Sequence, residues 1–170
     1  MRVRRTLNPP RRGVAQVLET AILLPVVMML TLGTCSTAMG VYYYQLVASL
    51  AREGARYASV HGTQYAAGTG NSAATASDIF NNAILPMAVG LNTTYLSYQV
   101  EWGTDVSGSW AWTSWDSSAK SPISYNPNSP PPGEPQYNSV SVTVTYQWTP
   151  DLNITGPLNL TSTSVMPMSF

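Results

Sequence analysis

The stretch LETAILLPVVMML, Leu18–Leu30, decides how the N-terminal part of this chain folds. It carries a single charge, Glu19, at the edge of a long apolar run, and no residue from Thr20 to Tyr44 is charged. As a helix, Thr20–Val41 would be about 33 Å long, and the hydrocarbon core of a bilayer is about 30 Å thick. The run therefore predicts one transmembrane helix, within residues 20–44.

The residues that flank the apolar run predict its orientation. Three tyrosines, Tyr42–Tyr44, follow the run, and aromatic residues prefer the membrane interface. Basic residues stay on the cytoplasmic side. Five of the eight basic residues lie before or beside Gly13, on the other flank: Arg2, Arg4, Arg5, Arg11 and Arg12. We therefore expect a basic cytoplasmic leader, residues 1–13, and an extracytoplasmic domain, residues 62–170.

Two other readings of the N-terminus stay open. A secretory signal peptide could be cleaved after Ala38, although the apolar run exceeds the ~7–15 residues of an ordinary h-region. The sequence Leu32-Gly33-Thr34-Cys35 distantly resembles a lipoprotein signal, but threonine before the cysteine fits poorly. Cys35 is more simply a small apolar residue of the helix, and one cysteine excludes a disulfide framework within the chain.

Composition argues against several function classes. Only 9% of the residues are charged and the net charge is +0, while the part after Gly13 is acidic on balance, so nucleic acid is not an expected partner. A Ser-His-Asp arrangement would have to use the single histidine, His61, and no serine of the sequence lies in the glycine pattern of a nucleophile elbow. Phosphate-binding glycine loops and metal-ligand spacings are absent from the sequence. We expect no enzyme activity, no catalytic or metal-binding residues and no cofactor.

The helical pattern continues past the tyrosines. VASLAREGARYASVHG, Val47–Gly62, is rich in alanine and favours a helix, which predicts one long element over residues 14–61. Arg52, Glu53 and Arg56 would lie on its outer half, where it meets a small sheet or a neighbouring subunit. Gly54 costs a helix roughly 1 kcal/mol relative to alanine, so it predicts a close contact. The alternative is an exposed charged face that merely tolerates the glycine.

RRGVAQVLETAILLP followed by AREGARYASVHG resembles the TadE-like family of pilus assembly proteins. These are pseudopilins or minor pilins of the tight-adherence (Tad, type IVc) pilus. The family pattern corresponds here to Arg11-Arg12-Gly13, Glu19, Leu23-Leu24-Pro25 and Ala51–Ala58, over about the first 62 residues. One difference from the family pattern lies near the N-terminus. In the family pattern the glutamate is the fifth residue after the cleavage site, whereas cleavage after Gly13 would make Glu19 the sixth residue of the mature chain.

The resemblance implies a structural role at the bacterial inner membrane, with possible incorporation into a pilus that serves cell adhesion. A prepilin peptidase would cut between Gly13 and Val14, and Glu19 would pair with a neighbouring subunit. The implied partners are other pilins or pseudopilins and the Tad assembly machinery.

The remaining sequence predicts an α+β domain with an antiparallel sheet of at least three strands against the long helix. Thr63–Asn71 reads as a polar loop, and Ser77 as the cap of a short helix that ends at Pro86. Apolar alternation predicts strands in Thr93–Trp102, in YNSVSVTVTYQW and in LTSTSVMPMSF, the last at a sheet edge because of Pro167.

Between these strands, residues 104–135 read as a loop rich in tryptophan and proline. Trp110, Trp112 and Trp115 could form a partner-binding surface, or they could cover a small core, which we favour. Two functions follow from different classes: a minor pilin or pseudopilin, or a single-pass membrane protein whose outer domain binds a ligand or partner unrelated to a pilus. Only the first requires Glu19 and a processed N-terminus.

Overall fold

The computed structural model describes residues 11–106, 108–125, 135–150 and 156–169. Its helices and strands are α1 (Arg11–Val60), α2 (Thr63–Thr69), α3 (Ala76–Ile79), β1 (Leu96–Val106), β2 (Ser109–Ser114), β3 (Ile123–Tyr125), β4 (Pro135–Tyr137), β5 (Ser139–Trp148) and β6 (Leu158–Pro167). Single π- or 3-10 turns are η1 (Phe80–Ile84), η2 (Leu85–Met87), η3 (Thr93–Tyr95) and η4 (Trp115–Ser117). The chain divides into two compact units, Met1–Met39 and Gly40–Phe170. The predicted α+β class is confirmed.

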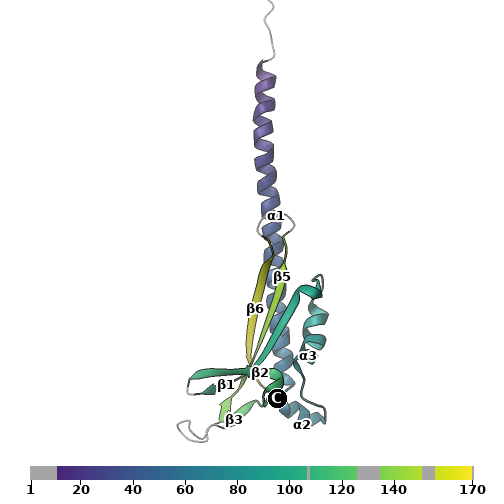
Figure 1. Ribbon diagram of the computed structural model, residues 1–170, viewed down its shortest axis with the longest axis vertical. Helices are drawn as coiled ribbons and strands as arrows, with labels where there is room; N and C mark the ends of the chain where they lie inside the picture. The colour runs from purple at the N-terminus through teal and green to yellow at the C-terminus, as the bar shows by residue number, and fades with distance from the viewer. Residues whose placement is uncertain (1–10, 107, 126–134, 151–155, 170) are drawn as a thin grey trace, which may run out of the picture. The chain divides into compact units, whose positions relative to one another are not determined.

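The first unit contains the apolar part of α1 (Figure 1), and its large apolar side chains are exposed. Threonine hydroxyls in this part donate to carbonyl oxygens of the preceding turn, as Thr31 Oγ1 does to Val27 O at 3.0 Å and Thr37 Oγ1 to Gly33 O at 2.9 Å. Such bonds satisfy the hydroxyl donors without water, as a bilayer requires. By length and composition, α1 is the one helix of the described residues suited to cross a membrane.

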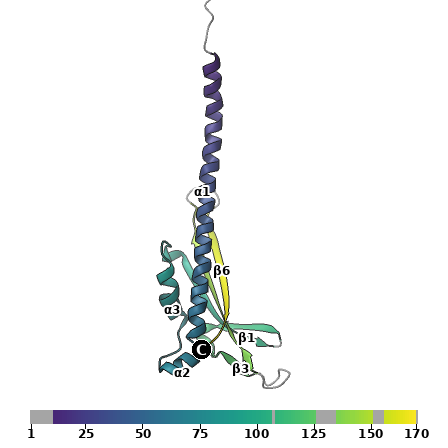
Figure 2. The ribbon, with the colours of Figure 1, turned by 180° about the vertical axis from the view of Figure 1, so that it is seen from behind.

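The second unit pairs the last part of α1 with a four-stranded antiparallel sheet in the order β2-β1-β5-β6 (Figures 1 and 2). Leu96 of β1 lies opposite Tyr146 of β5, and Val140 of β5 lies opposite Met166 of β6. Strand β6 lies at one edge, as Pro167 predicted, because proline cannot donate to a further strand. Strands β3 and β4 form a separate two-stranded sheet.

The core of this unit lies between α1 and one face of the sheet. The buried residues of α1 recur every three or four positions, which gives one helix face: Val47, Leu50, Ala51, Ala55 and Ala58. The buried apolar residues of the sheet occur at every second position of β5 and lie on one face of β1: Leu96, Val100, Val140, Val142, Val144 and Tyr146. Four small residues, Ala51, Gly54, Ala55 and Ala58, lie on the packed helix face and allow a close approach.

Gly54 lies at one such close approach. A Cβ atom at Gly54 would lie 3.1 Å from Ile84 Cδ1 and 3.1 Å from Val142 Cγ1. Ile84 comes from η1 and Val142 from β5, so the glycine contacts both the helical segment and the sheet. Both neighbours are fully buried, which leaves them little room to move away.

Two predicted loops are wrong. Ser109–Ser114, inside the predicted loop 104–135, is strand β2, and Ile123–Tyr125 is β3; residues 126–134 of that loop lie outside the described part. The predicted loop Thr63–Asn71 contains helix α2, whose end is set by Gly70. Gly70 has φ 73°, a left-handed conformation that glycine adopts readily, and its N–H donates to Ala66 O.

The tight packing at Gly54 gives the first prediction. Gly54→Leu should lower the stability of the second unit, because overpacking a buried contact costs about 1–3 kcal/mol. Gly68→Leu is the matched control: Gly68 is also helical, but nothing lies within 4 Å of its Cβ position. The full chain in detergent should show a lower melting midpoint by near-ultraviolet circular dichroism for the first variant only. Equal midpoints for both variants would remove the close-contact argument.

Candidate functional site

Charge at the start of α1 is the first candidate feature. Glu19 lies in α1 with an exposed side chain, one residue before the uncharged run begins at Thr20. Gly13 and Val14 lie in the first turn of α1, and their side chains are not among those described. The remaining leader, residues 1–10, also lies outside the described residues. The Glu19 side chain therefore lies exposed on α1 and is not packed into the core.

The predicted charged residues on the last part of α1 flank Gly54 in sequence but lie off the packed face of the helix. Arg52 and Arg56 are exposed and Glu53 is half-buried, whereas Gly54 between them is buried. Arg52 and Arg56 are four residues apart, so they lie on one helix face. The glycine thus serves the contact with Ile84 and Val142, and the two arginines remain open to solvent on α1.

Trp110 and Trp112 form an exposed aromatic pair on β2. Their ring centroids are 5.6 Å apart with an interplanar angle of 21°, and the side chains are 44% and 37% exposed. Trp112 lies opposite Gly103 of β1, and a Cβ on that glycine would come within 2.5 Å of the Trp112 ring. The Trp112 ring therefore packs against the backbone of Gly103, and this contact holds one face of the ring in place.

The signal for this pair was present in the sequence. Trp110 and Trp112 are two residues apart, the spacing of one strand face, and Asp105 and Gly108 mark the preceding turn. Gly108 has φ 83°, and its N–H donates to Asp105 Oδ1 at 2.9 Å. Every residue of β2 is exposed, so it lacks the apolar alternation by which the other long strands were predicted.

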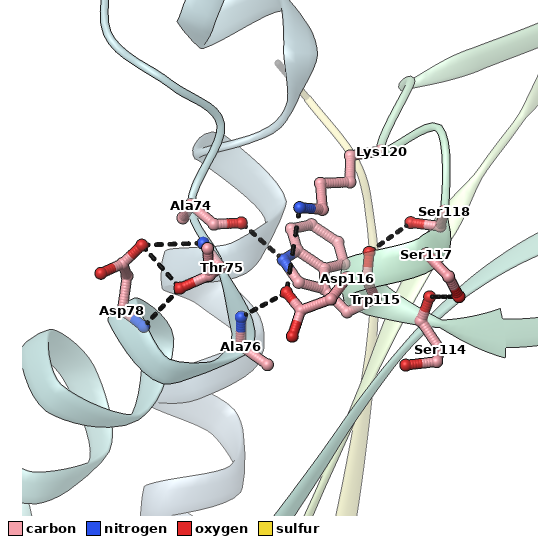
Figure 3. A network of polar contacts seen from close by, with 10 residues as sticks. All are labelled: Ala74, Thr75, Ala76, Asp78, Ser114, Trp115, Asp116, Ser117, Ser118 and Lys120. Carbon is pink, nitrogen blue, oxygen red and sulfur yellow. Dashed lines mark hydrogen bonds and ion pairs between the residues drawn. The ribbon is translucent and has the colours of Figure 1, made fainter.

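Trp115 does not belong to this surface, which corrects the grouping of the three tryptophans. It is fully buried, and its Nε1 donates to Ala74 O at 2.8 Å (Figure 3). Lys120 Nζ lies 5.7 Å from the centre of the same ring. Trp115 therefore joins the segment before α3 to η4, and the expectation that tryptophan covers a small core is confirmed at this position.

A capping box starts α3 beside Trp115 (Figure 3). Thr75 Oγ1 accepts from Asp78 N at 3.1 Å, and Asp78 Oδ2 accepts from Thr75 N at 2.9 Å and from Thr75 Oγ1 at 2.7 Å. The cap is therefore Thr75, where the sequence had suggested Ser77. These bonds to Thr75, with a smaller contribution from Lys120, hold the pKa of Asp78 below its usual 3.8.

His61 lies among aromatic rings at the end of α1. It stacks on Tyr57 with ring centroids 3.8 Å apart, and its Nδ1 is 2.8 Å from Tyr57 O. These contacts give the ring a structural role in closing the helix. Within the described ranges, no three His, Cys, Asp or Glu side chains come together as metal ligands would.

Comparison with known proteins supports the N-terminal resemblance. A family model described as TadE-like protein matches residues 13–56, which include Glu19 and the Arg52–Arg56 segment. The resemblance seen in the sequence is thereby confirmed over this stretch. No curated protein and no solved structure matches the chain.

The lowered pKa of Asp78 gives a prediction about pH. A carboxyl group whose folded pKa is below its unfolded value stabilises the fold above the unfolded pKa, and this contribution is lost as pH falls through the folded pKa. Asp78→Asn should therefore lower the melting midpoint at pH 7, and the difference from the original chain should disappear at an acid pH below the lowered pKa of Asp78. The effect is small because Asp78 is exposed.

Ser77→Ala is the control for this measurement. Ser77 is exposed in the same turn but accepts no capping bond, so its replacement should leave the midpoint nearly unchanged at both pH values. A pH-independent loss in Asp78→Asn would show that the carboxylate charge is not what stabilises the turn.

Proposed function

We propose that this protein is a minor pilin or pseudopilin of a Tad-type (type IVc) pilus, held in the bacterial inner membrane by α1. Its N-terminus lies in the cytoplasm, and its C-terminal domain lies outside. It acts as a structural component with other pilins or pseudopilins and the Tad assembly machinery, and it has no catalytic role. A prepilin peptidase cuts after Gly13.

One combination of observations carries this proposal. The TadE-like match at residues 13–56 covers both the apolar part of α1 and the part that packs on the sheet. The apolar part exposes large side chains such as Met29, 73% exposed, and Leu30, 65% exposed. A helix that is apolar on all sides requires lipid or other helices around it. A pilin provides both environments, first the bilayer and then the packed filament.

Glu19 has a specific role in this proposal. A carboxylate at the centre of a bilayer costs at least ~2.5–3.5 kcal/mol on insertion scales, and less near an interface. Cleavage after Gly13 frees the α-amino group of Val14, and Glu19 of one subunit pairs with that amine on its neighbour. Leaving either charge unpaired in low dielectric is strongly unfavourable, so the pair sets the axial register between subunits. A simpler role, contact with headgroups or with Arg12, is the competing explanation.

The exposed Trp110–Trp112 pair supports a second candidate function. Tryptophan is enriched at protein interfaces, and this pair is already ordered by Gly103 and by mutual stacking. The outer domain would then bind a ligand or an envelope partner unrelated to a filament. Loss of that binding in Trp110→Ala, with piliation unaffected by Glu19→Ala, would favour this alternative.

Protease accessibility tests the topology. Protease added to spheroplasts should digest residues 62–170, while a tag at the N-terminus survives, because the basic leader stays in the cytoplasm. Immunoblots against the tag and the outer domain give the readout. A protected outer domain with loss of the tag would reverse the orientation.

Substitution of Glu19 tests the assembly mechanism. Glu19→Ala should leave membrane insertion and protein level intact, since it removes a charge from an apolar segment, but should abolish or strongly reduce piliation. Glu19→Asp keeps the charge on a shorter side chain and should impair piliation partly. Glu101→Gln is the control, since it removes a carboxylate from β1 and should leave piliation normal. Normal piliation of Glu19→Ala cells, counted by electron microscopy, would exclude the charge pair.

A further inference from the structure

Strand β2 is an unprotected edge of the four-stranded sheet. It pairs with β1 on one side, and no strand of the described residues lies on its other side. All of its residues, SWAWTS, are exposed, and none is charged or a proline. Edge strands are usually protected by lysine, proline or a covering segment, because their unpaired N–H and C=O groups attract a further strand. The opposite edge, β6, carries Pro167, so β2 is the edge that remains open to a partner.

The sheet face beside this edge is aromatic and acidic. Residues that lie opposite each other in an antiparallel pair share a face of the sheet. Three opposite pairs of β1 and β2 share the outward face: Trp110 with Asp105, Trp112 with Gly103, and Ser114 with Glu101. Helix α1 packs on the other face, against Val140, Val142 and Val144. The stacked tryptophans therefore lie between two carboxylates on the face that α1 leaves open.

Both carboxylates are already oriented. Glu101 Oε1 accepts from Gln99 Nε2, and Asp105 Oδ1 accepts from Gly108 N, each at 2.9 Å. In the part of the chain that the structure describes, neither second oxygen, Glu101 Oε2 nor Asp105 Oδ2, takes part in a hydrogen bond or an ion pair. Each carboxylate therefore keeps one acceptor oxygen for a further donor.

The charges of this face favour a cation from another molecule. The π face of tryptophan attracts an ammonium or guanidinium group, and a nearby carboxylate adds to that attraction. Residues 62–170 include one basic residue, Lys120, whose Nζ lies 3.9 Å from Asp116 Oδ1. Arg52 and Arg56 belong to α1, which packs on the other face of the sheet. No basic side chain of the described residues thus neutralises the carboxylates beside the tryptophans.

We propose that β2 accepts an extended segment of a partner protein as a further strand, with arginine or lysine side chains of that segment over Trp110 and Trp112. Alternate residues of an added strand lie on one face of the sheet, so a segment with a basic residue at every second position fits. Backbone hydrogen bonds to β2 provide affinity, and the basic side chains provide selectivity.

The reach of the basic side chains agrees with this arrangement. The added strand would lie two strand spacings, about 9.6 Å, from β1, a gap that arginine or lysine and a carboxylate side chain span together. Asp105 and Glu101 then lie beside successive cations of the segment. The inference goes beyond the proposed pilin function, because this contact takes no part in the pairing of Glu19.

Peptide binding to the purified full chain, in an uncharged polyoxyethylene detergent, tests the cation site. The probe is a short fluorescent peptide in which arginine alternates with threonine, and the readout is fluorescence anisotropy. Trp110→Ala should weaken binding about fivefold, the size of an exposed cation–π contact. Asp105→Asn should weaken it about threefold at low salt only, because asparagine can still accept from Gly108 N while its charge is gone.

Two controls isolate the charge. Glu53→Gln removes a carboxylate from α1, on the other side of the sheet, and should leave the affinity unchanged. A peptide with glutamine in place of arginine should bind at least about tenfold more weakly than the arginine peptide, because it offers no cation.

Hydrogen exchange of the same complex tests the added strand. Backbone amides of β2, Ser109–Ser114, should exchange more slowly when the arginine peptide is bound, because the added strand accepts from their free N–H groups. Strand β6, Leu158–Pro167, is the internal control, since it is also an edge strand and its exchange should not change.

Three outcomes would overturn the inference. Equal affinity for the arginine and glutamine peptides, or for the original chain and Trp110→Ala, would exclude the cation site. Peptide binding without slower exchange in β2 would exclude the added strand. Binding of an oligosaccharide such as chitohexaose, with neither peptide bound, would assign the tryptophan pair to carbohydrate. Each result is obtained without pili, so normal piliation of Glu19→Ala cells would overturn the charge pair and leave this site untouched.

Discussion

The close approach of α1 to the sheet is the interaction on which the second unit depends. Alanine and glycine on one helix face bring the helix backbone near Val142 of β5, and η1 adds Ile84 to the same contact. Each buried apolar side chain contributes roughly 1.5–3 kcal/mol relative to an exposed one, but only if the gap between the two layers closes. Larger residues on the helix face would hold the layers apart, and the core residues beyond Gly54 would lose contact as well.

This constraint explains why one helix has two kinds of sequence. Up to Met39 its apolar residues occur on all sides and are exposed, whereas from Val47 to Ala58 they follow one face, with Arg52 and Arg56 on another. The first pattern suits a surrounding that is apolar in every direction, and the second suits packing on one side and water on the other. Tyr42–Tyr44 lie between these two parts of α1, and tyrosine favours the boundary between lipid and water.

The same physics decides how far the fold could be predicted. Apolar periodicity predicted α1, β1, β5 and β6, because each buries one face or runs through an apolar stretch. Strand β2 buries nothing, so periodicity missed it, although Asp105, Gly108 and the Trp110–Trp112 spacing were readable. Helix α2 was missed because its signals are the flanking glycines, Gly62 and Gly70, which also occur in loops. The contact of Gly54 with Ile84 and Val142 depends on three distant segments, and a single sequence records only that a glycine is present.

Residues that build the fold and residues that the proposed function uses are largely separate. Val142, Ile84 and Trp115 are fully buried, so changes there alter folding before they alter any contact with a partner. Glu19 and Trp110 are exposed and lie outside the buried core. Their side chains therefore contribute little to the packing of that core. A substitution at these positions is therefore expected to leave folding nearly unchanged, which lets it test a proposed role separately from stability.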